Sequence, residues 1–235
     1  MKTPAIWFFA GGEQGKGELN PFTRSFITRM KERYGSYFRV VEGIYLKSPF
    51  LNVVRGLWWA QHPHRRPERS AVLHKTLDQI TGLSHSYNQE LFLVASSYGS
   101  VIAAQAACLL AAGRKKSGVK PAPVHVFLGA SMISKKSLLF RELKKYQEEG
   151  LIGTLIYDEL QDEGDNSMGI GGTNRFSAVL NALGICFPWL TLNYKGPSFL
   201  NTDPQTGHIH RRRSKTEQKA ADFIRVMEQN IIVSV

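Results

Sequence analysis

The sequence predicts an α/β protein: a three-layer sandwich in which helices cover both faces of a mostly parallel, doubly wound sheet. Strand and helix patterns alternate along almost all of the 235 residues. The strand-like runs are apolar at nearly every position, which is typical of strands buried on both faces of a parallel sheet. No internal repeat is visible, and the length suits one large core, so we expect a single domain over residues 1–235.

The first half of the chain begins with an apolar run at 5–10, which predicts a strand. A helix follows over 20–35, because its aromatic and aliphatic residues recur at helical spacing and Gly35 is a typical helix stop. The β-branched and aromatic run at 37–46 predicts a second strand. After a proline-containing loop, apolar residues at helical spacing predict a helix over 69–83.

The strongest signals come next. The run at 90–96 predicts a buried strand, and the helix expected over 99–113 is apolar on nearly every face, so it must be covered on most sides. A strand at 124–130, a charged helix over 137–150 and a strand at 152–159 continue the alternation. The last third is expected to add a helix, a strand and a final helix, at 174–184, 190–196 and 214–231.

The composition is that of a folded, basic protein. It is 43% hydrophobic and 21% charged, which excludes a disordered or fibrous chain. A net charge of +11 favours anionic partners, such as an anionic surface or an acidic substrate, although a solvated basic surface is the plainer interpretation. The signatures of RNA-recognition motifs and zinc fingers are absent, so we expect no specific nucleic acid. Nucleic-acid binding through the "HIHRRRSK" segment is a further alternative, and it predicts a steep salt dependence.

The cellular setting expected from the sequence is the cytoplasm. Cys108 and Cys186 are the two cysteines, and this number gives no disulfide framework. The first residues, "MKTPAIWFFAGG", are interpreted as a buried strand rather than a signal peptide, because the apolar run is short and contains Pro4. No stretch approaches the roughly 18 apolar residues that a membrane-spanning helix needs.

Three serines, Ser96, Ser97 and Ser100, lie where the buried strand at 90–96 meets the apolar helix. A serine in a sharp strand-to-helix turn projects its hydroxyl above the carboxyl edge of the sheet, where ligands of such folds bind. Small neighbours are needed in that turn, and "ASSYG" supplies Ala95 and Gly99 around Ser97. Ser97 is therefore the candidate nucleophile, and Ser96 and Ser100 are interpreted as small turn residues.

The chain resembles the α/β-hydrolase family from about Ala5 to Ile231, with A-x-S-x-G in place of the family's G-x-S-x-G. The family order is nucleophile, acid, histidine, each in a loop after a successive strand. The matching residues are Ser97, then Asp165 with Asp162 as the alternative acid, then His208. The resemblance also implies an oxyanion hole formed by backbone N–H groups near Gly12 and at Tyr98.

Together these features predict a serine hydrolase, an esterase, lipase or thioesterase, that cleaves a small-molecule or lipid acyl ester without a cofactor. Ser97 attacks the carbonyl, His208 transfers the proton, and Asp165 or Asp162 orients the imidazole. His208 is preferred to His210 because Gly207 lets its loop turn back. The alternative is a non-catalytic protein of the same fold that binds a ligand or partner in the same pocket. The sequence leaves the acyl chain, the leaving group and the oligomeric state open.

Trp58 and Trp59 lie in the segment after the second predicted strand. They are interpreted first as packing residues. Under the hydrolase hypothesis they would instead line an acyl pocket near the sheet edge or touch a membrane. His62 and His64, with His208 and His210, invite comparison with a metal site. No carboxylate or cysteine stands at a spacing that would complete the ligand set, so we expect no metal.

Overall fold

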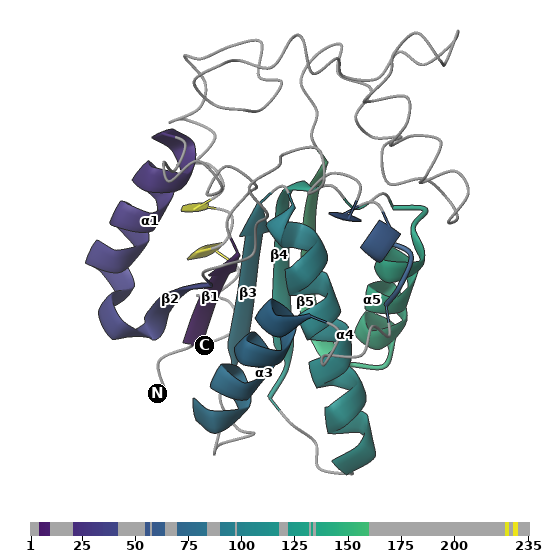
Figure 1. Ribbon diagram of the computed structural model, residues 1–235. Helices are drawn as coiled ribbons and strands as arrows, with labels where there is room; N and C mark the ends of the chain where they lie inside the picture. The colour runs from purple at the N-terminus through teal and green to yellow at the C-terminus, as the bar shows by residue number, and fades with distance from the viewer. Residues whose placement is uncertain are drawn as a thin grey trace, which may run out of the picture.

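The computed structural model describes residues 5–9, 21–41, 55–56, 58–63, 70–83, 90–96, 98–117, 122–131, 133, 135–159, 224–225 and 228–229. These residues contain a five-stranded sheet with the strand order β2-β1-β3-β4-β5. Every neighbouring pair of strands is parallel, and the arrows in Figure 1 all point the same way. The predicted α/β class and parallel sheet are therefore confirmed. The strands are β1 (Ala5–Phe9), β2 (Phe38–Val41), β3 (Leu91–Ser96), β4 (Val124–Ser131) and β5 (Ile152–Glu159).

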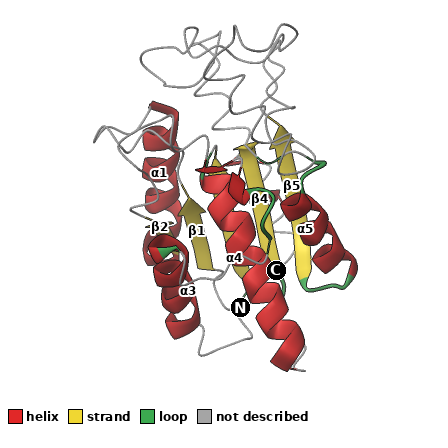
Figure 2. Ribbon diagram, turned by 45° about the vertical axis from the view of Figure 1, so that its right-hand side comes forward, coloured by secondary structure: helices red, strands yellow, loops and turns green. Residues whose placement is uncertain are grey.

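Helices pack on both faces of this sheet. One face carries α1 (Pro21–Tyr34), and the other carries α3 (Ala71–Leu83), α4 (Gly99–Ser117) and α5 (Leu138–Glu148). Figure 2 shows α4 lying along the strands, and it contacts β1, β3 and β4. The chain moves from β1 outward to β2 and then returns past β1 to β3, so its direction across the sheet reverses between β1 and β3.

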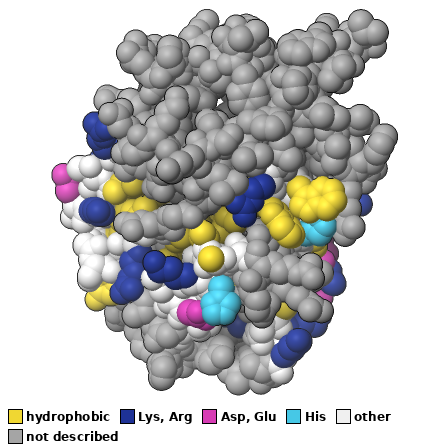
Figure 3. Space-filling model, in the orientation of Figure 1, with side chains coloured by type: hydrophobic (Ala, Val, Ile, Leu, Met, Phe, Trp, Pro, Cys, Tyr) yellow, Lys and Arg dark blue, Asp and Glu magenta, His cyan; other side chains and the backbone are white. Residues whose placement is uncertain are grey.

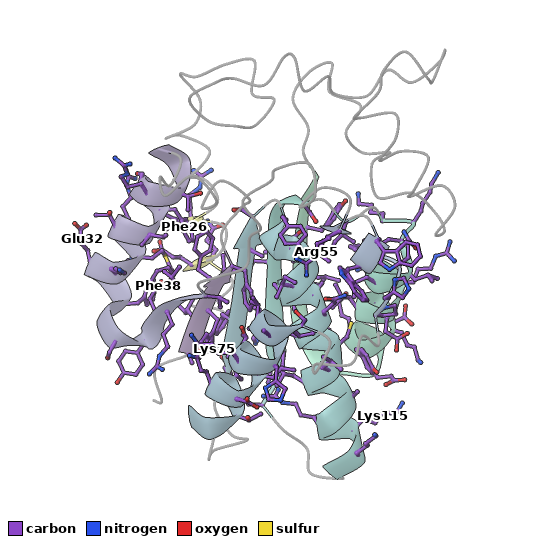
Figure 4. The ribbon with its side chains drawn as sticks, viewed as in Figure 1. Phe26, Glu32, Phe38, Arg55, Lys75 and Lys115 are labelled. Atoms are coloured by element: carbon purple, nitrogen blue, oxygen red, sulfur yellow. The ribbon has the colours of Figure 1, made fainter. Side chains whose placement is uncertain are left out.

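Side chains alternate between the two faces and form two separate cores. In β1, Ile6 and Phe8 face α1, whereas Trp7 and Phe9 face α4. The α1 side is rich in phenylalanine, and Phe26 and Phe38 lie edge to face with their centroids 6.2 Å apart (Figure 4). The α4 side is lined by small residues of the helix, which let it approach the strands closely. Ile224, from the predicted final helix, is buried in the phenylalanine core, and Glu228 pairs with Arg33 at 2.9 Å.

The helix α4 is buried at almost every position from Val101 to Cys108, as its apolar composition predicts. It is longer than expected, because it continues through Gly113 to Ser117 instead of ending at the glycine. The basic residues of its last turn favour this extension, since cations stabilise the negative end of a helix. The guanidinium of Arg114 also donates to the carbonyl oxygen of Ala122, which ties the helix end to the segment before β4.

Other helix ends follow their local sequence. Gly35 adopts a left-handed conformation, with φ of 54°, in the short 3₁₀ turn η2 (Gly35–Tyr37) that follows α1. Ser137 caps α5 by accepting the N–H of Phe140 at 3.2 Å. The second strand, β2, has four described residues where the sequence predicted a run to residue 46. The predicted elements at 174–184 and 190–196 lie outside the described residues.

Candidate active site

The connection from β3 to α4 consists of two residues, Ser97 and Tyr98. All six residues of β3 are buried, and α4 begins at Gly99. Ser97 itself lies outside the described residues, but both of its neighbours are described: Ser96 is the buried last residue of the strand, and Tyr98 is buried in the α4-side core. A buried strand thus leads into a buried helix through a connection of only two residues.

Tyr98 immediately precedes the helix. Its side chain is 2% exposed, and its carbonyl oxygen accepts the N–H of Val101 at 3.0 Å, which starts the helical hydrogen bonding. This bond fixes the peptide that follows Tyr98 at the amino end of α4, where the N–H groups carry the positive end of the helix dipole. The predicted role of Tyr98 depends on its own N–H group, and this role stays a prediction.

Ser96 and Ser100 are not turn residues, which corrects the interpretation from the sequence. Ser96 belongs to β3 and Ser100 to the first turn of α4, and both are buried. The hydroxyl of Ser131, at the end of β4, donates to the hydroxyl oxygen of Ser100 at 3.0 Å. The N–H of Ile133 donates to Ser131 Oγ, also at 3.0 Å. A chain of hydrogen bonds therefore joins the start of α4 to the end of the neighbouring strand.

The remaining predicted site residues, Gly12, Asp162, Asp165 and His208, lie outside the described residues. The strands that precede the first three are described. Phe9, the last residue of β1, is the register partner of Ala95 in β3, so the segments after these two strands leave the same edge side by side. The strand β5 ends at the same edge but is separated from β3 by β4.

The two tryptophans point in different directions. Trp59 is partly buried against the α4-side core, as expected of a packing residue, whereas the side chain of Trp58 is 40% exposed. Gln105 of α4 holds this turn, because its Nε2 donates to the carbonyl oxygens of Trp59 at 3.1 Å and His62 at 3.2 Å. The Nδ1–H of His62 in turn donates to the carbonyl oxygen of Trp58 at 2.7 Å.

Similarity to known proteins does not indicate a function for this chain. No family model, curated protein or solved structure matches the chain. Among the described residues, no three histidine, cysteine, aspartate or glutamate side chains come together as metal ligands, and no helix is long and apolar enough to cross a bilayer.

A buried histidine that the sequence did not single out, His125, lies near the start of β4 and is 4% exposed. Its ring stacks on Phe92, its register partner in β3, with centroids 4.5 Å apart and planes 10° apart. The N–H of Thr154 donates to Nδ1 at 3.1 Å, so the neutral ring carries its proton on Nε2. Burial lowers the pKa of His125 from 6.5 to about 4, which keeps the imidazole neutral.

Two other groups with reactive chemistry, the imidazole of His125 and the thiol of Cys108, are unsuited to take part in a site at the β3–α4 connection. His125 lies at the amino end of its strand, opposite to the edge where Ser96 ends β3. Cys108 is a free, buried cysteine in the middle of α4, and burial raises the pKa of its thiol well above the usual range. An un-ionised, buried thiol is a poor nucleophile. Neither residue is therefore a candidate for the reactive group.

Proposed function

We propose that the protein is a serine hydrolase that cleaves an acyl ester or thioester. The observation that carries the proposal is the two-residue connection between the fully buried β3 and the buried α4, with Ser97 as its first residue. Short strand-to-helix turns of this type hold a nucleophilic serine because they leave its hydroxyl exposed above the sheet. In the family that the sequence resembles, the nucleophile follows a central parallel strand in the same way.

The position of the connection within the sheet supports the proposal. In open parallel sheets, ligands bind at the carboxyl ends of the strands where the chain reverses its direction across the sheet. With the order β2-β1-β3-β4-β5, that reversal falls between β1 and β3. The segment with Gly11 and Gly12 follows β1, and Ser97 follows β3, so the two sequence features that the hydrolase hypothesis pairs belong to neighbouring strands.

The amino end of α4 adds an electrostatic argument. The helix has 19 residues and starts two residues after Ser97. The N–H groups of its first turn and the aligned peptide dipoles favour negative charge near that end. Such preorganised dipoles stabilise the oxyanion that develops when a serine attacks a carbonyl.

The proposed reaction has two steps. Ser97 Oγ bonds to the carbonyl carbon, its proton passes to His208, and the alcohol or thiol leaves with that proton. Water then attacks the acyl-serine, His208 again accepts and returns the proton, and the free acid is released. Asp165, or Asp162 in its place, orients the imidazole, and the N–H groups near Gly12 and at Tyr98 bind the oxyanion. No cofactor takes part.

The wider setting is proposed with the activity. The described strands and helices fit an α/β-hydrolase fold in a single domain over residues 1–235. The basic composition, with a net charge of +11, favours acyl substrates that are acidic or presented at an anionic surface. We place the protein in the cytoplasm, where a free, buried thiol such as that of Cys108 stays reduced.

A fluorophosphonate probe tests the proposal directly, because it reacts with activated serines. We expect one label per chain, located at Ser97 by peptide mass mapping, and no label on the denatured protein. Ser97→Ala should abolish labelling and lower the hydrolysis of p-nitrophenyl esters about 10⁶-fold in kcat. His208→Ala should lower labelling steeply, while Ser96→Ala, a matched change in the adjacent residue, should keep it. A folded protein that the probe never labels would support the non-catalytic alternative instead.

A further inference from the structure

The short turn between β2 and α3 has an inner and an outer side. Gly56 and Ala60 are buried on its inner side. Arg55 and Trp58 are three residues apart in helical conformation, so they share the outer side. The ring of His62 lies against Trp58, with centroids 5.1 Å apart. A cation, an indole and an imidazole thus follow one another along the outer side of this turn.

The turn is fastened to two helices. On one side Gln105 of α4 donates to two of its carbonyl oxygens. On the other side the turn completes the amino end of α5: Gln61 Oε1 accepts the N–H of Leu138 at 3.2 Å, and the carbonyl oxygen of Ala60 accepts the N–H of Leu139 at 3.1 Å. Trp58 is therefore presented on a preorganised support, and little conformational entropy is left to lose when its indole is covered.

A second exposed apolar side chain lies beside this turn. Leu138, the first residue of α5, is 39% exposed, against 40% for Trp58, and its N–H is bound by Gln61 of the turn. Of the described residues, the other large exposed hydrophobic side chain is Tyr37, which lies before β2 at the opposite end of the sheet. Isolated exposed apolar side chains are common, but two that are held by the same hydrogen-bonded turn indicate an interaction surface.

Cations border the two apolar side chains. Figure 3 shows hydrophobic, basic and histidine side chains side by side at the right of the molecule, and Figure 4 shows Arg55 over the end of α4 toward which the strands point. Lys135 and Lys136 directly precede the capped start of α5, and the ammonium group of Lys135 lies 5.5 Å from the ring centre of Tyr157 in β5. Arg55 stands three residues before Trp58, and Lys135, Lys136 and Arg141 stand within three residues of Leu138, so we assign these four basic residues to the same surface.

We propose that this Trp58 surface, formed by Trp58, His62 and Leu138 with their bordering cations, docks on an anionic lipid bilayer. Tryptophan prefers the boundary between headgroups and acyl chains, because its ring is apolar and its N–H is polar. Lysine and arginine beside it are attracted to anionic headgroups. The surface joins both features, and an excess of positive charge over the whole chain adds to the attraction. Docking here goes beyond the proposed hydrolysis and does not require it.

Binding to vesicles tests the proposal without any turnover. Wild-type protein should co-sediment with vesicles of phosphatidylcholine mixed with phosphatidylserine, weakly with phosphatidylcholine alone, and less as salt is raised. The double variant Trp58→Ser/Leu138→Ser should bind the mixed vesicles at least about ten-fold more weakly. Tyr37→Ser, the matched change at the other exposed hydrophobic residue, should bind as wild type. Equal binding to both vesicle types, or an equal loss in Tyr37→Ser, would overturn the proposal.

Charge variants give a second measurement that does not depend on removing a tryptophan. Arg55→Gln and Arg141→Gln should each weaken binding to the mixed vesicles about five-fold, because one cation near an anionic bilayer contributes about 1 kcal/mol. Arg24→Gln and Arg29→Gln, exposed on α1 at the other face of the sheet, serve as controls and should change it little. Equal losses in both sets would show binding through net charge alone. Sedimentation velocity that shows a wild-type dimer and a monomeric Trp58→Ser/Leu138→Ser variant would assign the surface to a second copy of the chain instead.

Discussion

At the carboxyl end of the strands the buried polar groups include the hydroxyls of Ser96, Ser100 and Ser131, whereas at the amino end of β4 the buried polar group is the imidazole of His125. A hydroxyl rotates and can exchange hydrogen-bond partners, since it both donates and accepts. The imidazole of His125 has no such freedom, because Phe92 fixes the plane of its ring and Thr154 fixes its tautomer. One end of the sheet is thus adaptable and the other is locked.

This difference separates a region suited to chemistry from a region suited to stability. Substitutions of the proposed catalytic residues, and of Ser131 at the carboxyl end, are expected to change activity. Substitutions around His125 are expected to change the free energy of unfolding while activity is preserved in the folded protein. The expected effects below run from the largest to the smallest.

Apart from the loss of the nucleophile itself, the largest effect is expected from the acid proposed to orient His208. Asp165→Asn should keep the fold but favour the wrong imidazole tautomer, which lowers kcat about 10⁴-fold in the serine-protease precedent. Asp162→Asn is the matched variant three residues away and should be close to wild type. Ester hydrolysis, with circular dichroism as the check on folding, decides between them. Full activity in both variants would show that the proposed triad is wrong.

The second effect is a pH dependence of stability that arises from His125. Its pKa is 6.5 when unfolded and about 4 when folded, so the unfolded state binds the proton more tightly. The free energy of unfolding that depends on the neutral His125 is therefore fully present above pH 6.5. It is lost as the pH falls toward 4, by about 3 kcal/mol in total. Urea unfolding at a series of pH values should show this loss, and His125→Val should show a shallower pH dependence. An unchanged slope in His125→Val would contradict the locked, neutral imidazole.

The third effect comes from the glycine that makes room for His125. A Cβ atom at Gly153 would lie 2.8 Å from His125 Cε1 and 3.0 Å from Pro123 Cβ. Gly153→Ala should therefore cost about 1–3 kcal/mol of unfolding free energy. Gly113→Ala is the control, because a Cβ there meets nothing within 4 Å, and alanine in a helix should instead stabilise by about 0.5–1 kcal/mol.

A double-mutant cycle sharpens this prediction. If the cost of Gly153→Ala comes from the imidazole, then combining it with His125→Ala should remove a large part of the cost, because the two residues touch. Additive effects would mean that the clash with Pro123 dominates. In either case ester hydrolysis by the folded variants should match the wild type, since this end of the sheet lies opposite to Ser96.

Much of the fold was predictable because it follows local patterns. The fully buried β3 and the apolar helix after it are recognisable within 27 residues, Leu91–Ser117. The sequence predicted that α4 ends at Gly113, but the helix continues to Ser117. This could not be predicted locally, because Arg114 is held by the carbonyl oxygen of Ala122, a residue outside the helix. The strand predicted at 37–46 is confirmed over the four described residues of β2, which pair with β1, and residues 42–46 lie outside the described residues.

The candidate site was predictable only in part, for a similar reason. The pattern around Ser97 is local, so the sequence reveals it. The roles of Ser100 and His125 are not local: Ser100 is bound by a serine 31 residues away, and His125 by the backbone of Thr154, 29 residues away. A single histidine within an apolar strand pattern, as in "VHVFLGA", was the signal for a buried imidazole, but its partners come from another strand.

The smallest effect is expected at Ser131, and it tests whether the adaptable end of the sheet is coupled to activity. Ser131→Ala removes the donor to Ser100 and the acceptor of the buried Ile133 N–H, which should cost about 1–2 kcal/mol of stability. Ser36→Ala, an exposed serine in η2, is the control and should be neutral. Because Ser100 lies in the first turn of α4, three residues after Ser97, loss of this bond should also lower kcat in ester hydrolysis. Gly153→Ala should not lower kcat, even if it destabilises the protein as much as Ser131→Ala does. If Ser131→Ala is destabilised but keeps full kcat, the hydrogen bond between Ser131 and Ser100 does not influence activity, and this prediction is wrong.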